Sequence, residues 1–555
     1  MKARRKLDVW TIIVFALLAL FIIFFIYPSI RLLWEAFFTT DKNTGEMAFT
    51  MKYFTKFFSK RRNFIAIWNS FKVSFWVMMI ALVLGIPFSY FFSFYNLKGR
   101  KLLFVSALLC TMSAPFIGAY SWVKLMGNNG IITNLLGALG IKMGTIYGFG
   151  GILLVQSLKL FPLVMIYMNG AFQDIDSSLL EASTNLGCTG LKRFFKVVLG
   201  LTAPTILAAA LIVFMRAFAD FGTPEIIGRN YTTLPVLIYD SYISETSSDY
   251  SFAAAVSVIT MLITALVFLL QKFATSRFKF TINSLHPIQR KDPKGVGGVL
   301  MHLYCYFLVV VSLLPQFYII VDSFRDYKGQ VPQDTYSFSN YENAARKLLG
   351  RSVANTLLIS FLSLAVIIVI AVLIAYLVVR RSSFMSHTVD TISMLPYIMP
   401  GAVIGISLIL GFNNRYFSLT GTVFIMVIAL TIRRMPYTSR SATATMMQIP
   451  VTTEEAGISL GASKMKTFIK ITVPQMVSGI VSGAILSFVS IITEVSSGVF
   501  LYNTSTITLT LSTYTNIQLG SDGTASAFAA ITTLLTIACL AAYLFATQGN
   551  EKMRV

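Results

Sequence analysis

Two basic residues of this sequence, Lys159 and Arg433, lie inside long apolar runs, and each stands three residues before a proline, Pro162 or Pro436. A charge in a membrane-like environment is costly, so such a residue is a candidate for a role in binding or transport. A kinked helix with a cation beside its proline could line a central pathway. Alternatively, the long basic side chain reaches the membrane surface and takes no part in transport. The sequence leaves both interpretations open.

Two acidic residues, Asp220 and Glu494, also lie in apolar surroundings. Their segments are Phe218-Ala-Asp-Phe-Gly-Thr-Pro224 and Ile492-Thr-Glu-Val-Ser-Ser497. Carboxylates at the outer mouth of a pathway could meet a cation or a soluble binding protein, or they could cap the outer ends of helices. Arg216, one turn before Asp220, is its predicted partner within the helix. The candidates for a translocation path are therefore Lys159, Pro162, Asp220, Arg433, Pro436 and Glu494.

No grouping of residues predicts catalysis or a metal site. The chain has three histidines and four cysteines, all dispersed: His286, His302, His387, Cys110, Cys188, Cys305 and Cys539. Neither zinc-ligand spacing nor a catalytic triad can be drawn from them. The sequence also lacks a Gly-Lys dipeptide, so it has no phosphate-binding P-loop. We expect no catalytic residue, no metal and no cofactor bound by this chain.

The elements that must position these residues are membrane helices. Of the 555 residues, 55% are hydrophobic and 12% charged, and the mean hydropathy is +0.72. A membrane span needs roughly 20 mostly apolar residues, and about twelve such runs recur along the chain. The net charge of +22 is dispersed among short loops. This dispersal argues against nucleic acid, and its alternation places both termini in the cytoplasm of a multi-pass protein in the lipid bilayer.

The sequence repeats itself. The segment that begins at Asn69 aligns with the one at Asn355, an offset of 355 − 69 = 286, and Asp220 aligns with Glu494, an offset of 494 − 220 = 274. Between these points, Lys159-Leu-Phe-Pro162 aligns with Arg433-Arg-Met-Pro436. We predict two homologous halves of six spans each, 1–275 and 299–555. A polar cytoplasmic linker, 276–298, joins them.

One polar loop occurs in both halves, at 174–200 and 448–474. Each loop contains the spacing of a capping box, Ser178 with Glu181 and Thr452 with Glu455, which predicts the start of a short helix. A glycine, Gly187 or Gly461, then predicts the helix end, because glycine tolerates the left-handed backbone there. A basic amphipathic segment follows and leads into the next span. We therefore predict a compact pair of helices on the cytoplasmic face of each half.

These loops resemble the EAA loop of type I ABC importer permeases. The second copy has the pattern in full: Glu455, Ala456, Gly461, Ile471 and Pro474. The first copy has Glu181, Ala182, Gly187 and Val197, but Gly200 replaces the family's proline. The resemblance implies two tandem type I permease repeats of six helices, in which this loop is the coupling helix that docks on an ATPase subunit.

The same resemblance implies the partners. ATP and magnesium would bind to a separate ABC ATPase, present as two copies, and an extracytoplasmic substrate-binding protein would deliver the cargo at a bacterial inner membrane. The fused layout and the segment 219–224 resemble permeases of the ferric-iron importer group. That group is close to permeases for organophosphonates, sugar phosphates, thiamine and polyamines. The cations Lys159 and Arg433 would suit an anion or a complexed metal better than a bare ferric ion.

Two other classes of membrane protein compete with this interpretation. A secondary transporter could also have twelve spans in two halves, but it would show acids or histidines deep in its spans and no docking loops. An integral-membrane enzyme would need a clustered nucleophile, metal ligands or paired carboxylates. The duplicated loop favours the importer permease, driven by alternating access. Copurification of an ATPase would separate it from both alternatives.

Overall fold

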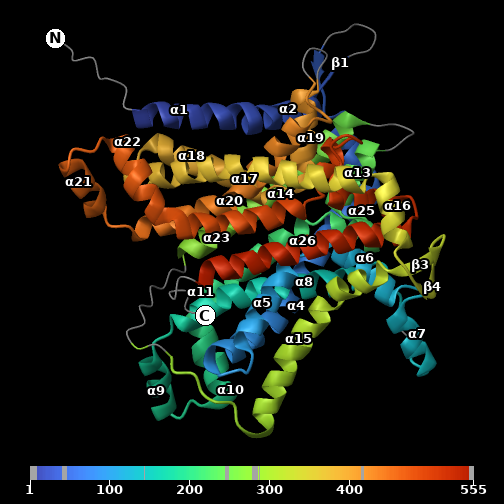
Figure 1. Cartoon of the computed structure of the whole chain (residues 1–555), viewed down its shortest axis with the longest axis horizontal. Helices are drawn as coiled ribbons and strands as arrows, with labels where there is room; N and C mark the ends of the chain where they lie inside the picture. The colour runs from blue at the N-terminus through green and yellow to red at the C-terminus, as the bar shows by residue number, and fades with distance from the viewer. Residues whose placement is uncertain are drawn as a thin grey trace. The chain divides into compact units, whose positions relative to one another are not determined.

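The computed structural model of this chain describes residues 9–40, 47–142, 144–243, 249–277, 286, 288–413 and 418–548. Figure 1 shows that the described part of the chain is built from helices, with two small pairs of antiparallel strands. The ends of the chain and residues 278–285 and 287 of the polar linker lie outside the described residues. The cytoplasmic placement of both termini therefore stays a prediction.

The first half contains the elements α1 to α14. Their bounds are α1 Val9–Phe21, η1 Ile22–Ile26, α2 Tyr27–Phe37, β1 Phe38–Thr40, β2 Met47–Phe49, α3 Lys52–Ser59, α4 Arg61–Phe94, α5 Arg100–Met112, α6 Pro115–Met126, α7 Ile131–Ala138, α8 Phe149–Gln173, α9 Ser177–Asn185, α10 Gly190–Arg193, η2 Phe194–Val198, α11 Leu199–Phe218, α12 Gly222–Ile227, α13 Leu234–Ile243 and α14 Tyr250–Arg277. The segments η1 and η2 are single π-helical turns between α-helices.

The second half contains the elements α15 to α26. Their bounds are α15 Gly295–Asp322, β3 Arg325–Lys328, β4 Val331–Tyr336, α16 Ser339–Lys347, α17 Leu349–Arg380, α18 Phe384–Ile398, α19 Gly401–Phe412, α20 Val423–Gln448, α21 Val451–Ser459, α22 Lys464–Thr467, η3 Phe468–Thr472, α23 Val473–Ile492, α24 Gly498–Leu501, α25 Leu509–Gln518 and α26 Asp522–Gln548. The order of long and short helices follows that of the first half, except that α7 lies between α6 and α8 and no described helix lies between α19 and α20.

The described residues contain nine helices that are long and apolar enough to cross a membrane, and two bent helix pairs raise this number to 11. Helix α20 is not among them because it carries three arginines, Arg433, Arg434 and Arg440. It occupies the place in the second half that α8 occupies in the first. With α20 included, each half offers six spans, and the predicted all-helical polytopic fold is confirmed.

The third span of each half is broken at a proline. Helices α5 and α6 are bent by 98° where α6 begins at Pro115, and α18 and α19 are bent by 113° around Pro400. Proline lacks the N–H that would continue the helix, and it disfavours helical backbone at the residue before it. The two prolines align in the repeat, so both halves break the span at the same place.

The helices form two compact units that do not follow the order of the halves. The first unit consists of residues 1–55, 241–258 and 322–555. In it, the N-terminal span α1–α2 packs on helices of the second half: α1 contacts α17 and α18, and α2 contacts α19. Figure 1 shows α1, in blue, running beside α18 and α17. In this contact, the ring centroid of Trp10 lies 4.3 Å from that of Tyr376 on α17.

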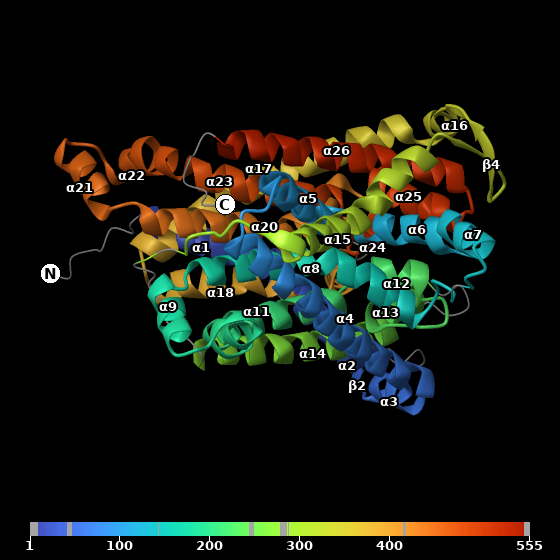
Figure 2. The same ribbon diagram turned by 90° about the horizontal axis from the view of Figure 1, so that it is seen from below.

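The second unit consists of residues 56–240 and 259–321. In it, α15, the first span of the second half, packs on helices of the first half. Tyr304 on α15 donates a hydrogen bond of 2.9 Å to the carbonyl of Leu84 on α4, and Figure 2 shows α15 beside α5. Each unit therefore combines most of one half with the first span of the other half. The boundaries predicted for the two halves are those of the sequence repeat and differ from the boundaries of the two compact units.

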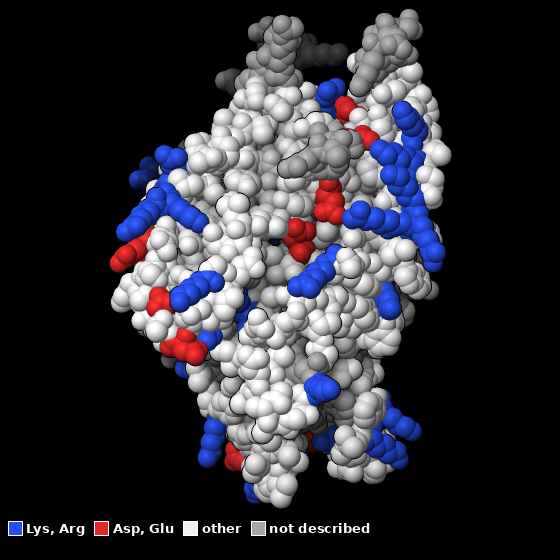
Figure 3. Space-filling model, turned by 90° about the vertical axis from the view of Figure 1, so that its right-hand side faces the viewer, with Lys and Arg blue, Asp and Glu red and all other residues white. Residues whose placement is uncertain are grey.

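Short elements at the ends of the long helices include the hairpin β3–β4, in which Arg325 pairs with Asp334 at 2.9 Å. Figure 3 looks onto the face where this hairpin lies and shows basic and acidic side chains among a majority of uncharged ones. This pattern suits the water-exposed end of a helical membrane protein, because charged residues are largely excluded from its spans.

Candidate functional site

The loop of the first half folds as predicted into a short helix, α9, but the predicted cap is wrong. The N-cap is Asp176, whose carboxylate Oδ1 accepts a hydrogen bond of 2.9 Å from the backbone N–H of Ser178. Ser178 therefore lies inside the first turn and does not form a capping box with Glu181. The physical reason is that Asp176, itself a strong cap former, stands two residues earlier. Helix α9 ends as predicted close to Gly187: its last residue is Asn185, and Gly187 has a φ of +74°.

The loop of the second half forms the matching helix, α21, and here too the capping box is wrong. The N-cap position is taken by Pro450, which offers no side-chain hydrogen bond, so Thr452 lies within the first turn and not before it. The end of the helix follows the prediction, because Gly461 has a φ of +85°. Apart from the adjoining residues, no atom of the described part of the chain lies within 4 Å of the place where a Cβ on Gly187 or Gly461 would stand. The backbone conformation is therefore the reason for these two glycines.

The basic segment after each loop helix is the first turn of the next span. In the first half, α10, η2 and α11 form one helix from Gly190 to Phe218, and in the second half α22, η3 and α23 form one from Lys464 to Ile492. The π-helical turns η2 and η3 begin at Phe194 and Phe468, which are equivalent positions of the repeat. Such turns are rare and concentrate at functional sites. The sequence contains no signal for them that pattern reading detects.

A buried ion pair ties α21 to α17. The guanidinium Nε of Arg380 donates to Glu454 Oε1 at 2.9 Å, and both side chains are about nine-tenths buried, with exposures of 9% and 10%. Arg380 also donates to the carbonyl of Ile449 at 2.5 Å, just before α21 begins. The hydroxyl of Tyr376 lies 3.4 Å from Glu454 Oε2. Sequence analysis missed Glu454, the residue before Glu455, because an acid in a polar loop gives no sign of burial.

The equivalent positions in the first half are apolar. Phe94 stands where the second half has Arg380, and Leu180 where it has Glu454, and both are buried. The aromatic neighbours are kept, because Tyr90 contacts Phe194 at 4.8 Å as Tyr376 contacts Phe468 at 4.7 Å. The two loops therefore have the same shape, but different forces hold them.

The predicted loop residues Glu181, Ala182, Glu455 and Ala456 are exposed. Beside them the turns present large apolar side chains to solvent: Leu186 is 86% exposed and Leu460 is 90% exposed. Apolar side chains displayed on a polar, helical loop are typical of a protein–protein interface. The arrangement can receive a partner surface at one place on each unit.

In the first unit, the candidates Arg433 and Glu494 are partners. The guanidinium of Arg433 pairs with Glu494 Oε1, and that of its neighbour Arg434 pairs with Oε2. The exposed fractions of the side chains are 11% for Arg433, 14% for Arg434 and 2% for Glu494. Glu494 also accepts a hydrogen bond of 3.2 Å from the backbone N–H of Ser497, so it caps the turn after α23. Pro436 lies inside α20 and is buried.

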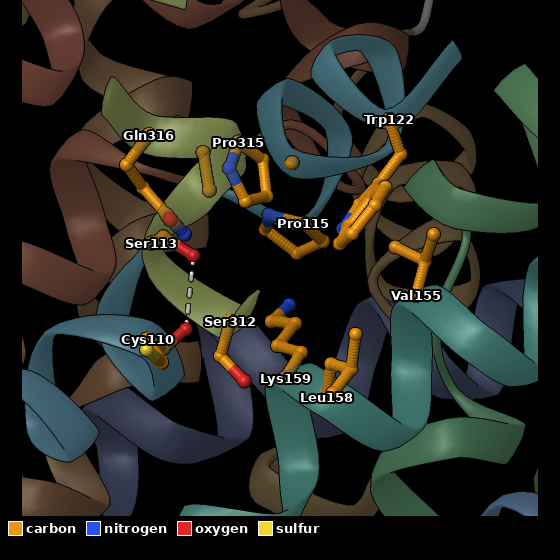
Figure 4. Close-up of a pocket in the computed structure, with 12 residues that line it drawn as sticks. Cys110, Ser113, Pro115, Trp122, Val155, Leu158, Lys159, Ser312, Pro315 and Gln316 are labelled. Atoms are coloured by element: carbon orange, nitrogen blue, oxygen red, sulfur yellow. Dashed lines mark hydrogen bonds between the residues drawn. The ribbon is translucent and has the colours of Figure 1, made fainter. Parts of the chain in front are cut away.

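In the second unit, Lys159 lines a small cavity at the break between α5 and α6. Figure 4 shows its ammonium group pointing into the cavity, near Ser312 and Pro315 of α15 and Pro115 of α6. The hydroxyl of Ser312 is buried there and has no hydrogen-bond partner among the described residues. The set that lines the cavity is Cys110, Ser113, Ala114, Pro115, Gly118, Trp122, Val155, Leu158, Lys159, Ser312, Pro315 and Gln316.

Asp220, in the same unit, accepts a hydrogen bond of 2.9 Å from the side-chain amide of Gln156 on α8. Gln156 is buried, and sequence analysis did not single it out because it carries no charge. Pro162 lies inside α8 and is also buried. Thus α8 brings Gln156 and Lys159 to one stretch of helix, as α20 brings Arg433 and Arg434. Within the described residues, no three His, Cys, Asp or Glu side chains gather as metal ligands.

Comparison with known proteins gives the family. The model of the binding-protein-dependent transport system inner membrane components matches residues 85–280 and 332–555. The chain belongs to this family. It is a multi-pass inner-membrane permease subunit of an ABC importer, with one family domain in each half and no catalytic role of its own. The tandem-repeat architecture predicted from the sequence is confirmed.

Individual relatives differ in substrate. The chain is 26% identical over 534 residues, 95% of its length and 76% of the relative's, to the ferric transport system permease protein FbpB of Actinobacillus pleuropneumoniae. It is 28% identical over 255 residues, 44% of its length and 87% of the relative's, to the spermidine/putrescine permease PotB of Haemophilus influenzae. A crystal structure of a bacterial alginate ABC transporter with its periplasmic protein matches 50% of this chain and 96% of that one, at 16% identity and a TM-score of 0.41.

Proposed function

We propose that this permease imports ferric iron or an iron complex and that its loop helices α9 and α21 are the docking points for two copies of an ABC ATPase. The proposal that iron is the substrate rests on the similarity to a ferric transport permease over 95% of the chain. The polyamine relative covers 44% of the chain. A likeness that extends through both halves favours the iron group.

The geometry of the loops supports the docking role. Each helix projects Glu181 or Glu455 into solvent at its middle and a leucine at its end. Each continues through a tight glycine turn into the helix of the next span, so a push on the loop moves that span. Because the ATPase copies are identical, they need two similar surfaces, and the duplicated loop supplies them. ATP and magnesium belong to that partner.

The candidates for the translocation path fall into two matched groups. Lys159, Pro162 and Asp220 belong to one unit, and Arg433, Pro436 and Glu494 to the other. In each group a helix with an internal proline carries a cation close to the break of the third span. Lys159 lines the cavity at the break between α5 and α6, and Gly401 of α19 lies against the Arg433 guanidinium. We infer that this region of each unit lines the path and that an extracytoplasmic binding protein delivers the cargo to it.

A second candidate substrate is an anionic organic solute such as a phosphonate or a sugar phosphate. The specific observation in its favour is the presence of three cations among the path candidates and their neighbours: Arg433 and Arg434 pair with one carboxylate, and Lys159 lines a cavity. Buried positive charge attracts anions strongly in a medium of low dielectric constant. An iron ion carried with anionic ligands would satisfy both observations.

The test is ATP hydrolysis by the chain reconstituted with the ATPase and binding protein encoded beside it. The panel contains ferric salts, an iron chelate, a phosphonate, a sugar phosphate, thiamine and a polyamine. We expect the ferric salt or chelate to stimulate hydrolysis, and Glu455→Lys to abolish the stimulation. The matched control is Glu342→Lys, which reverses an exposed charge on α16. For both variants, the amount of ATPase retained on the membrane is also measured. If only a solute without iron stimulates hydrolysis, the proposal that iron is the substrate is wrong.

A further inference from the structure

The polar segment that joins the halves contacts the first loop helix. Both backbone groups of His286 are used: its N–H donates to Asp176 Oδ2 at 3.1 Å, and its carbonyl accepts from the N–H of Ser177 at 3.0 Å. The imidazole Nδ1 lies 3.7 Å from the same carboxylate oxygen, although the ring is mostly exposed. Asp176 therefore serves at once as the cap of α9 and as the anchor of the linker.

The linker is attached a second time, at the end of α4. The N–H of Lys291 donates to the carbonyl of Phe94 at 2.9 Å, and the N–H of Asn96 donates to the carbonyl of Lys291 at 3.0 Å. The side-chain amide of Asn96 adds a hydrogen bond of 2.7 Å to Asp292. In Figure 1 the yellow-green trace passes beside α9 on its way to the start of α15. The linker thus connects α9 to α4 through ordered hydrogen bonds.

The second loop helix is held to its neighbouring span in another way. There, Arg380 on α17 pairs with the buried Glu454 of α21. The first half lacks this pair, because Phe94 and Leu180 occupy the equivalent positions, and the second half lacks the linker anchor, because Pro450 stands where the first half has Asp176. Each loop helix is therefore held to the second span of its half by polar contacts, which differ between the halves.

We propose that the linker between the halves is part of the coupling apparatus: through His286 and the positioning residue Asp176, it holds α9 to α4, as the Arg380–Glu454 pair holds α21 to α17. This inference rests on the proposed docking role of α9. Loosening the linker contact frees the first docking helix from the span that it should move. Hydrolysis of ATP by the docked partner then continues with less solute moved.

Three variants separate this contact from the fold of α9. His286→Pro removes the linker N–H donor and leaves α9 itself unchanged. Asp176→Ser keeps a cap for Ser178, since serine is a good N-cap residue, but its hydroxyl is too short to reach His286 as well. His286→Ala is the matched control, because it keeps both backbone hydrogen bonds. The internal reference is Glu454→Gln, which weakens the connection of α21.

The first measurement is amide hydrogen exchange on the purified full chain without the ATPase. In His286→Pro and Asp176→Ser we expect the amides of α9 to exchange about tenfold faster, as loss of one or two hydrogen bonds would allow, while α21 is unchanged. Glu454→Gln should show the reverse. If α9 exchanges no faster in His286→Pro than in His286→Ala, the linker does not hold the helix and the proposal is overturned.

The second measurement is solute moved per ATP hydrolysed in the reconstituted importer. We expect this ratio to fall several-fold in His286→Pro and Asp176→Ser, with unchanged copurification of the ATPase. An unchanged ratio despite faster exchange of α9 would overturn the coupling role. Glu181→Lys distinguishes the two levels of the account: if it leaves both ATPase binding and hydrolysis intact, the docking role of α9 has failed and the linker inference fails with it.

Discussion

Arg433 on α20 and Glu494 after α23 form a buried ion pair between positions 61 residues apart. Arg434 completes the arrangement by pairing with the second carboxylate oxygen. Two residues that the sequence offers as separate candidates are thus one structural feature, which joins the fourth and fifth spans of the second half. Its first function is to hold those helices together, whatever it contributes to the path.

Removal of the Glu494 charge should therefore be strongly destabilising. Glu494→Gln removes the carboxylate that the Arg433 and Arg434 guanidinium groups share, and breaking a buried pair in this way costs about 3–5 kcal/mol. We expect a clear fall in the thermal midpoint of the purified chain, measured by the fluorescence of its tryptophans. Asp334→Asn, which removes the exposed partner of Arg325, should leave the midpoint unchanged. Equal midpoints for both variants would show that the buried pair contributes nothing.

The Arg380–Glu454 pair allows a test by exchange between the halves. The single variants Arg380→Phe and Glu454→Leu each leave one buried charge without its ion-pair partner. Each should destabilise the chain by several kcal/mol. The double variant installs the residues that the first half has at Phe94 and Leu180. Because apolar replacement of a buried pair is often neutral, we expect it to recover most of the loss. A double variant as unstable as the sum of the singles would contradict the equivalence of the two sites.

The glycine turns of the loops predict a difference between similar substitutions. Gly461→Ala forces a left-handed conformation on alanine, which costs about 1–2 kcal/mol, and should weaken ATPase copurification by shifting α21. Gly200→Ala, in helical backbone with open space around it, should stabilise its helix by about 0.5–1 kcal/mol and leave copurification intact. Comparable losses in both variants would mean that the turn conformation is not what matters.

The cavity at Lys159 bears on the form of the cargo. If the path attracts anions, Lys159→Met should lower the stimulated transport of an anionic iron chelate about tenfold, equivalent to roughly 1.4 kcal/mol of lost attraction. Basal ATP hydrolysis should be unchanged. Lys101→Met, at an exposed position on α5, is the charge-matched control. Unchanged chelate transport in Lys159→Met would exclude the cavity from the path.

Hydrophobic runs and turn residues are read well from this sequence because they act locally. The spans, the duplicated loops and the helix ends at Gly187 and Gly461 follow from composition and backbone preference. The caps were wrong by a small register difference: Asp176 and Ser178 are both good caps, and nothing in the pattern says which one begins the helix. The breaks at Pro115 and Pro400 had a signal, the aligned prolines, whose consequence for the third span was not drawn.

The contacts between helices could not be predicted from the sequence. The pairing of Arg433 with Glu494 and the burial of Glu454 depend on which helices meet, and neither residue type nor spacing encodes that. The same holds for the packing of the first span of each half on helices of the other, since an apolar helix such as α1 fits many partners. His286 looked like one of three scattered histidines, and its backbone contacts with α9 have no sequence pattern.

The docking of an ATPase on the two loops is the central claim, and cysteine cross-linking tests it most directly. In a background without native cysteines, Leu186→Cys and Leu460→Cys place a thiol on the exposed tip of each loop, and Leu519→Cys places one on another exposed leucine, after α25. A short bifunctional reagent is added to membranes that contain the whole importer. We expect an ATPase adduct at both loop positions and none at 519. Absence of an adduct at both loops, or an equal one at 519, would contradict it.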